Sequence, residues 1–387
     1  MRLYKPNKDK PEFIMTTPKF LKWLLPPAPE SNRQQLREAL IESASKGKKI
    51  IVKFNHSITK INQKNEKQAE LFGKKLNEDD DDNDNDDKNT KIISLGIFDL
   101  VIDASGFGSK LRNYRIEDED DETRFKKYYT GISMCHGLIY NPDSVCDPKI
   151  IKKLGEGSML CFNNGIGFGL QRYGASEEDK RTSMYYMIPL KEISYLSDKF
   201  NIPRKTIFHK DKEIINNVKE WIKNELKIHN FSKDHFSAID NIDAISIRPL
   251  MQHPQNPKFN DNSELPLILI GDSLHAMPPY TGSGGNLALA DADELSDFII
   301  KNNSSITIKD LRILEKKFLK RAIPIMKQGN STKNYLIDND RKFRNGENVS
   351  DTGLMGAGYL FYIIASIFTY IYYLECFLHL RKDNGRS

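Results

Sequence analysis

Cysteine is scarce in this sequence, whose 387 residues contain only Cys135, Cys146, Cys161 and Cys376. The spacing of these residues contains no pair typical of a zinc site, and no histidine completes a pattern typical of a cysteine nucleophile. Four cysteines in a chain of this length also provide no disulfide framework, which favours a reducing compartment. We therefore expect neither a metal site nor a catalytic protein nucleophile.

A secretory signal and a nucleic-acid surface are also not expected. No apolar run follows a basic start at the amino end, so the sequence does not predict a cleaved leader. The 58 basic and 53 acidic residues leave a net charge of only +5. The lysines are scattered without interleaved aromatic residues, which favours an ordinary solvated surface over nucleic-acid binding.

One dense run of charge stands out, because Glu78 to Asp87 contains eight acidic residues in ten positions. The run has no turn glycine and no ordered ligand spacing, so it does not predict a calcium loop. It cannot bury apolar area, and a flexible loop at a hairpin tip costs little closure entropy. We assign residues 62–92 to an acidic disordered insertion between a strand at Ile50–Phe54 and a second strand near Asp99.

The most informative segment of the chain begins with an apolar strand that ends at Gly271-Asp272. A Pro-Pro turn follows, and then Gly282-Ser283-Gly284-Gly285-Asn286 opens a helix. Glycines let the backbone approach a ligand closely, and the amino end of a helix presents N–H groups to electron-rich atoms. Asp272 can accept hydrogen bonds from a chain of hydroxyl groups. These features predict a site for a polar, electron-rich cofactor.

This segment closely resembles the second flavin-binding motif of the FAD-dependent aromatic-ring hydroxylases, the single-component flavoprotein monooxygenases similar to salicylate hydroxylase, p-hydroxybenzoate hydroxylase and tetracycline monooxygenase. Ten positions fall in register, namely Gly271, Asp272, His275, Pro278, Pro279, Gly282, Gly284, Asn286, Asp291 and Ala292. The resemblance implies that Asp272 binds the ribityl chain of FAD. It also implies that Pro279 and the backbone of Gly282, Gly284, Gly285 and Asn286 lie at the isoalloxazine. We interpret His275 as structural.

Two further segments are similar to the same family. In Phe98–Arg112, an apolar strand runs into a glycine turn in which Gly106, Ser109 and Arg112 match the family's middle motif. Ser105 stands where the family has an aspartate. The segment from Ser31 to Leu40 has helical spacing, and the resemblance places its Arg33 near the cofactor. The alternative for Arg33 is an ordinary surface helix with a solvated side chain.

The family's Gly-x-Gly-x-x-Gly turn, which holds the FAD pyrophosphate at a helix amino end, is missing from this sequence. Residues 1–13 are charged and are broken by Pro6 and Pro11, and the glycine-rich run at 165–169 is typical of a strand. By comparison with the family we expect the chain to begin about a hundred residues late. It is then either a truncated form or a degenerate relative that binds FAD poorly.

Between the motifs, alternating strands are predicted at 129–140, 158–162, 166–171, 182–188 and 242–250, with helices at 214–228 and 308–325. The fold class is therefore mixed α/β. The resemblance implies an incomplete Rossmann-like FAD-binding lobe, formed by residues 1–127 and 251–345, and an antiparallel-sheet substrate lobe at 128–250. Trp221 is interpreted as a core residue of the second lobe.

The carboxyl end contains 22 residues without a charge, from Gly353 to Leu374. As a helix this segment is about 33 Å long, enough to cross a hydrocarbon core of about 30 Å. Tyrosines gather near both of its ends, as aromatic residues do at membrane interfaces. We predict a single transmembrane helix at 353–375, with the main lobe in the cytosol. The alternative is a buried closing helix of the globular fold.

The leading functional hypothesis is an FAD-dependent monooxygenase that hydroxylates an aromatic or apolar small molecule with NAD(P)H and O₂, as the resemblance implies. One rival is a non-catalytic, FAD-deficient, membrane-tethered remnant of the family, which the missing turn favours. Another is a flavin-dependent epoxidase of a membrane lipid, which the predicted anchor favours. The sequence does not indicate the oligomeric state, the substrate or the choice between NADH and NADPH.

Overall fold

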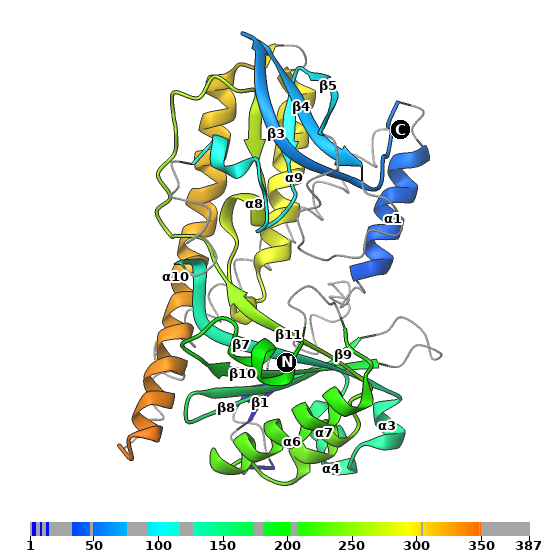
Figure 1. Cartoon of the computed structure of the whole chain (residues 1–387), viewed down its shortest axis with the longest axis vertical. Helices are drawn as coiled ribbons and strands as arrows, with labels where there is room; N and C mark the ends of the chain where they lie inside the picture. The colour runs from blue at the N-terminus through cyan, green and yellow to red at the C-terminus, as the bar shows by residue number, and fades with distance from the viewer. Residues whose placement is uncertain are drawn as a thin grey trace, which may run out of the picture. The chain divides into compact units, whose positions relative to one another are not determined.

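The structure is a computed structural model that describes residues 2–4, 8–9, 13–14, 33–46, 49–75, 92–116, 127–173, 181–202, 208–302, 305–347 and 349 (Figure 1). The chain divides into two compact units. The first comprises residues 1–98 and 122–250, and the second comprises residues 99–121 and 251–387. The sequence placed residues 1–127 with the FAD-binding lobe, whereas contacts within the chain group residues 1–98 and 122–127 with the sheet. The mixed α/β class is confirmed.

The first unit contains a seven-stranded sheet with the order β11-β7-β10-β9-β8-β1-β2. Its strands are β1 (Arg2–Tyr4), β2 (Phe13–Ile14), β7 (Tyr129–Tyr140), β8 (Ser158–Asn163), β9 (Ile166–Tyr173), β10 (Arg181–Pro189) and β11 (Ala244–Met251). β7, β8, β9 and β10 pair antiparallel, whereas β1 pairs parallel with β8. The strands predicted between residues 129 and 250 are confirmed, including the glycine-rich one.

Helices cover one face of this sheet, where Figure 1 shows α4, α6 and α7 side by side. The helices of the unit are α1 (Arg33–Lys46), α3 (Pro142–Val145), α4 (Pro148–Leu154), α5 (Tyr195–Phe200), α6 (Lys212–Ile228) and α7 (Asp234–Asp240). The fully buried residues of α6, namely Val218, Ile222 and Leu226, repeat every four positions and therefore form one stripe toward the core. Trp221 is half-buried and packs against this core, where its ring meets Tyr186 edge-on at 5.7 Å, in agreement with its interpretation as a packing residue.

A separate three-stranded sheet corrects two predictions. Its strands are β3 (His56–Asn65), β4 (Gln68–Lys75) and β5 (Ile93–Phe98), in the order β3-β4-β5. The strand predicted at Ile50–Phe54 is wrong, since these residues have no regular structure and Ile51 is 80% exposed. Residues 62–75 belong to the β3–β4 hairpin and not to the insertion, of which residues 76–91 lie outside the described ranges.

Polar composition explains why this hairpin escaped prediction. In β3 only Ile61 is fully buried, so the strand lacks the regular apolar alternation that identifies a half-buried strand. Backbone pairing with β4 holds it instead, and the Asn65 side chain accepts a hydrogen bond from the Lys67 N–H at 2.9 Å to close the turn.

The second unit is built around a short parallel pair of strands, β6 (Val101–Asp103) and β12 (Leu267–Leu269). Its helical segments are η2 (Arg112–Tyr114), α8 (Asp272–His275), η3 (Pro279–Thr281), α9 (Gly284–Asn302) and α10 (Ile308–Arg344). Helix α10 begins with a capping box between Thr307 and Asp310. It extends well beyond the predicted end at 325 and through Pro324, because Met326 and Leu336 continue its buried face.

Side chains of α10 cover the outer edge of β12. Arg312 donates a hydrogen bond to the Leu267 carbonyl at 2.8 Å, and Glu315 accepts one from the Leu269 N–H at 3.0 Å. Glu315 also forms a 2.6 Å ion pair with Arg115, and both side chains are 1% exposed. Burial, with the nearby Arg115 charge, lowers the pKa of Arg312 to about 10, although Glu315 opposes this shift. The strand edge is thus closed by a buried charged network.

Within the residues that the structure describes, no helix combines the length and apolar character needed to cross a bilayer. The predicted transmembrane segment at 353–375 lies outside these residues.

We expect Glu315→Ala to lower the free energy of unfolding by about 3–5 kcal/mol, because it leaves the buried Arg115 without a counter-charge. Lys316→Ala on the same helix is the matched control. Lys316 pairs with Asp261 at 2.8 Å, but these side chains are 58% and 54% exposed. The control should therefore cost at most about 1 kcal/mol. Urea denaturation of the two variants measures the difference, and equal losses would contradict the role of the buried pair.

Candidate functional site

The candidate site lies at the carboxyl ends of β6 and β12. Because the two strands are parallel, the loops that leave them emerge at the same edge. The loop after β6 contains Ser105 and Gly106, and the turn after β12 contains Gly271 and Asp272. The edge of a small parallel sheet is therefore the scaffold that brings the two family-like segments together.

The loop after β6 is organised by Asp103, a buried residue that the sequence analysis did not single out. One oxygen of its carboxylate accepts hydrogen bonds from the Ser105 N–H at 2.9 Å and the Ser105 hydroxyl at 2.5 Å. The other oxygen accepts from the Ser109 hydroxyl, which in turn accepts from the Arg112 N–H at 2.9 Å. The only sequence signal for this role was a charged residue at the end of an apolar strand.

The turn after β12 is held close to helix α9. Gly271 has a φ of +58°, and a Cβ built on it would lie 2.9 Å from the Ala288 side chain. Only glycine combines this backbone conformation with this close approach. The Gly271 N–H donates a hydrogen bond to the Asp291 carboxylate at 3.0 Å.

The predicted cofactor-binding residues of this segment gather around the amino end of α9. Asp272 is exposed, and its Oδ1 lies 3.9 Å from the position that a Cβ on Gly284 would occupy. Pro279, Gly282, Gly285 and Asn286 are also exposed. Gly282 has a φ of +61°, and a Cβ on Gly282 or Gly285 would meet no protein atom within 4 Å. The backbone here is accessible to a ligand.

The Leu287 N–H donates a hydrogen bond to the carbonyl of Ser283, the residue directly before α9, at 3.0 Å. The N–H groups of Gly284 and Gly285 belong to the first turn, which has no acceptors within its own helix. These groups also lie at the positive end of the helix dipole. They can therefore donate to an electron-rich ring edge while the Asp272 carboxylate accepts from hydroxyl groups beside them.

Buried polar groups hold this segment in place through hydrogen bonds. His275 is fully buried, and its Nε2 lies 2.7 Å from the Asp291 carboxylate, in agreement with its structural interpretation. Burial raises the pKa of Asp291, but hydrogen bonds from His275, Gly271 and Arg321 outweigh burial and hold the pKa below its usual value. His253 stacks on the Phe107 ring at 5.0 Å and accepts a hydrogen bond from the Ala276 N–H at 3.3 Å, which joins the loop after β6 to this segment.

Arg33 belongs to the other unit, where it is the first residue of α1. The predicted helix is confirmed, but the Arg33 side chain lies outside the description. Its proximity to a cofactor therefore stays a prediction. The cofactor contacts expected of Asp272, Pro279, Gly282, Gly284, Gly285 and Asn286 also stay predictions, although the structure brings these residues together.

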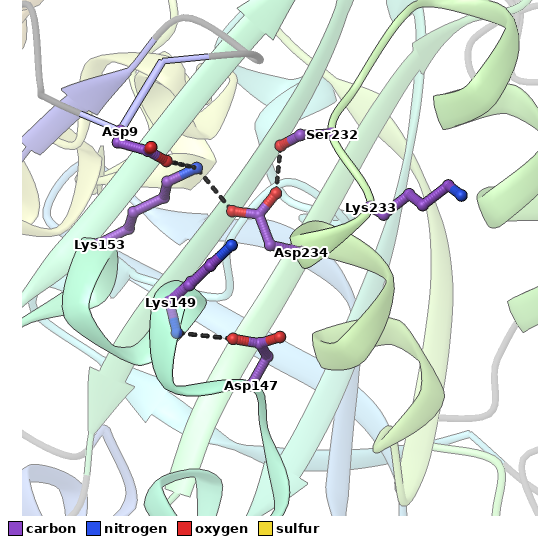
Figure 2. A pocket seen from close by; sticks show the side chains of 7 residues that line it. All are labelled: Asp9, Asp147, Lys149, Lys153, Ser232, Lys233 and Asp234. Carbon is purple, nitrogen blue, oxygen red and sulfur yellow. Dashed lines mark hydrogen bonds and ion pairs between the residues drawn. The ribbon is translucent and has the colours of Figure 1, made fainter.

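A polar pocket of about 360 Å³ lies in the sheet unit, lined by Asp9, Asp147, Lys149, Lys153, Ser232, Lys233 and Asp234. Figure 2 shows the Lys153 ammonium between Asp9 and Asp234, at 3.6 and 2.6 Å. Burial raises the pKa of Asp234, but Lys153 and Ser232 outweigh it and hold the pKa low. Three lysines and three aspartates leave no excess charge for an ionic ligand, and their pairing joins α4 to α7.

Comparison with known proteins identifies the segment around α9. The family of FAD binding domains matches residues 253–302, which span the turn after β12 and the whole of α9. No curated protein matches the chain in sequence. The resemblance of this segment to a flavin-binding motif is therefore confirmed.

Solved structures with a similar fold have low sequence identity to this chain, and they include a hydroxylase and a protein solved with FAD. One is 2,6-dihydroxypyridine-3-hydroxylase from Arthrobacter nicotinovorans, with a TM-score of 0.52 and 13% identity, covering 78% of this chain and 67% of that one. Another is CtdE in complex with FAD and a substrate, with a TM-score of 0.54 and 15% identity, covering 82% of this chain and 68% of that one. The chain therefore has the fold of flavoprotein monooxygenases over about two thirds of their length.

We expect Gly285→Ala to separate folding from cofactor binding. The added methyl group meets no protein atom, and alanine favours a helix over glycine by about 0.5–1 kcal/mol, so the apoprotein should be at least as stable. The methyl group would nevertheless occupy the open space beside the first turn of α9, where it should weaken FAD binding. Thermal unfolding and flavin titration measure the two effects. Unchanged FAD affinity would place the flavin elsewhere.

Proposed function

We propose that this chain is an FAD-dependent monooxygenase that oxygenates an aromatic or apolar small molecule with NAD(P)H and O₂. The observation that carries the proposal is the amino end of α9 with the turn before it, where Gly282, Gly285 and Asn286 are exposed and the Asp272 carboxylate lies beside Gly284. These residues lie within the segment that matches FAD binding domains.

The residues of the site fit the isoalloxazine and ribityl end of FAD. The first-turn N–H groups of α9 would stabilise the negative charge that a reduced isoalloxazine carries, because they are fixed donors at a helix amino end. Asp272 would accept hydrogen bonds from ribityl hydroxyl groups. The bound flavin supplies the redox chemistry with NAD(P)H and O₂, while the protein binds the flavin, orients it and limits access of water.

No protein nucleophile is needed for this reaction, since the protein contributes dipoles and shape. The fold of FAD-dependent hydroxylases supports an aromatic or apolar substrate class. The competing lipid epoxidase would add the oxygen atom across a double bond of a membrane lipid, and the apolar segment near the carboxyl end favours it. Comparing NAD(P)H oxidation with a phenolic and a sterol-like compound distinguishes these two activities.

We expect Asp272→Ala to weaken FAD binding by about 1–3 kcal/mol, because it removes an acceptor from hydroxyl groups that the complex buries. Asp293→Ala is the matched control, since Asp293 is an exposed carboxylate on the same helix as the donor groups. Flavin fluorescence titration of the two apoproteins measures the difference. Equal affinities for the two variants would contradict the assignment of Asp272.

The same titration of the unmodified chain tests the function itself. A purified chain that binds FAD and oxidises NAD(P)H supports the monooxygenase. A colourless chain that takes up no added FAD would instead support the non-catalytic remnant.

We further propose that residues 353–375 anchor the protein in a membrane with its main part in the cytosol. Support comes from the 22 uncharged residues and from the tyrosines near their ends. Deleting residues 351–387 should move the protein from the carbonate-washed membrane pellet to the soluble fraction. Deleting only residues 380–387 should leave it in the pellet. A full-length chain found in the soluble fraction would overturn this proposal.

A further inference from the structure

We propose that Asp291 is a positioning residue of the FAD site, which holds the Gly271–Asp272 turn at a fixed position relative to the amino end of α9. Arg321 of α10 fixes the position of the Asp291 carboxylate. The inference rests on the proposed FAD site for its functional consequence. The contacts that support it are independent of the cofactor.

The Asp291 carboxylate receives donors from three elements. One oxygen accepts from the Gly271 N–H at 3.0 Å and lies 2.7 Å from His275 Nε2. The other accepts from the Arg321 guanidinium at 2.7 Å. The carboxylate is fully buried, so each of these bonds replaces water that it has lost. A buried charge with three converging donors allows the turn little freedom to shift.

The contacts fall on one stripe of α9. Gly284 lies next to the Asp272 carboxylate, Ala288 lies next to Gly271, and Asp291 binds the Gly271 N–H. Their spacing of four and three residues places them on the same face of the helix. The two small residues allow close approach, and the aspartate sets which residue of α9 meets the turn.

Arg321 of α10 binds the same part of α9. Its two terminal nitrogens bind Asp291 at 2.7 Å and Glu294 at 2.9 Å, so the planar guanidinium spans two acids on α9. Lys317, one turn earlier on α10, also pairs with Glu294. Burial lowers the pKa of Arg321, but its bonds to Asp291 and Glu294 outweigh burial and raise it. Helix α10 thus determines where Asp291 lies.

This arrangement fixes the relation between the two cofactor-binding parts. Asp272 directly follows Gly271, whose N–H binds Asp291, and the donor N–H groups lie on the helix that carries Asp291. A displacement of the turn along α9 changes the span between the carboxylate and the donors. Both parts can bind one FAD molecule only when that span matches the cofactor.

Asp291→Asn is the decisive variant, because an amide of the same shape keeps one acceptor and turns the other oxygen into a donor. In one orientation the amide NH₂ would face Arg321, and in the other it would face Gly271 and His275. All three groups are donors, so the amide NH₂ has no acceptor in either orientation. We expect the variant to bind FAD at least tenfold more weakly, measured well below its melting temperature. We also expect the reduction potential of the bound flavin, at saturating FAD, to differ from that of the unmodified protein. Asp293→Asn on the exposed side of α9 should leave both quantities unchanged.

A second measurement needs no cofactor. In the apoprotein, amide hydrogen exchange at residues 271–275 should become faster in Asp291→Asn, whereas exchange in α6 of the other unit should not change. If the unmodified chain binds no FAD, the proposed function fails, and the exchange result still decides whether Asp291 positions the turn.

Wild-type FAD affinity together with wild-type exchange at residues 271–275 would overturn the proposal. A lower melting temperature with unchanged affinity and flavin potential would also overturn it, since Asp291 would then be merely structural. If Asp291→Asn does not fold, Arg321→Met replaces it, because the Arg321 side chain is 29% exposed and its removal leaves the Gly271 bond in place. This variant should show the same changes to a smaller extent, and unchanged FAD affinity in it would count against the proposal.

Discussion

The buried Asp291 carboxylate joins the turn after β12, helix α8 and helix α10 at a single point. A charge without water is tolerated only where donors surround it, so the elements that supply these donors are constrained together. The accessible residues of the candidate FAD site are Asp272 and the amino end of α9. Asp272 follows Gly271 in the chain, and α9 carries Asp291 itself. Their own positions depend on it, because neither the glycine-rich turn nor the first turn of a helix is rigid by itself.

A second charged network serves the strands below the site. A parallel pair of three-residue strands has few hydrogen bonds of its own and exposes polar edges. Arg312 and Glu315 of α10 occupy the outer edge of β12, and Arg115 neutralises Glu315 in the interior. Helix α10 therefore supports the site in two ways. Arg312 and Glu315 bind β12, and Arg321 binds Asp291. This explains why α10, which follows the glycine-rich segment along the chain, is needed for the geometry of that segment.

The loop after β6 departs from the family pattern in a way that the structure explains. Ser105 replaces the family's aspartate, and Asp103, two residues earlier, is buried with its oxygens bonded to Ser105 and Ser109. The carboxylate thus shapes the loop from inside, and the exposed position at 105 presents a hydroxyl group. Position 105 therefore adds no charge to the surface, which leaves Asp272 as the exposed acid of the two strand ends.

Local patterns in the sequence were sufficient for the glycine-rich segment around Gly282, the stripe of α6 and the strands between residues 129 and 250. Each of these depends on neighbours within a few residues and on regular burial. They were insufficient for the polar β3–β4 hairpin, the full length of α10 and the roles of Asp103 and Arg321. Strand pairing and buried ion pairs join residues that lie far apart along the chain, so no local pattern specifies the partner. The sequence therefore predicted which chemical groups form the candidate site, namely a carboxylate and the backbone of a glycine-rich helix start. Only the tertiary structure decided which buried charges hold them, because a buried charge is stable only where distant donors converge on it.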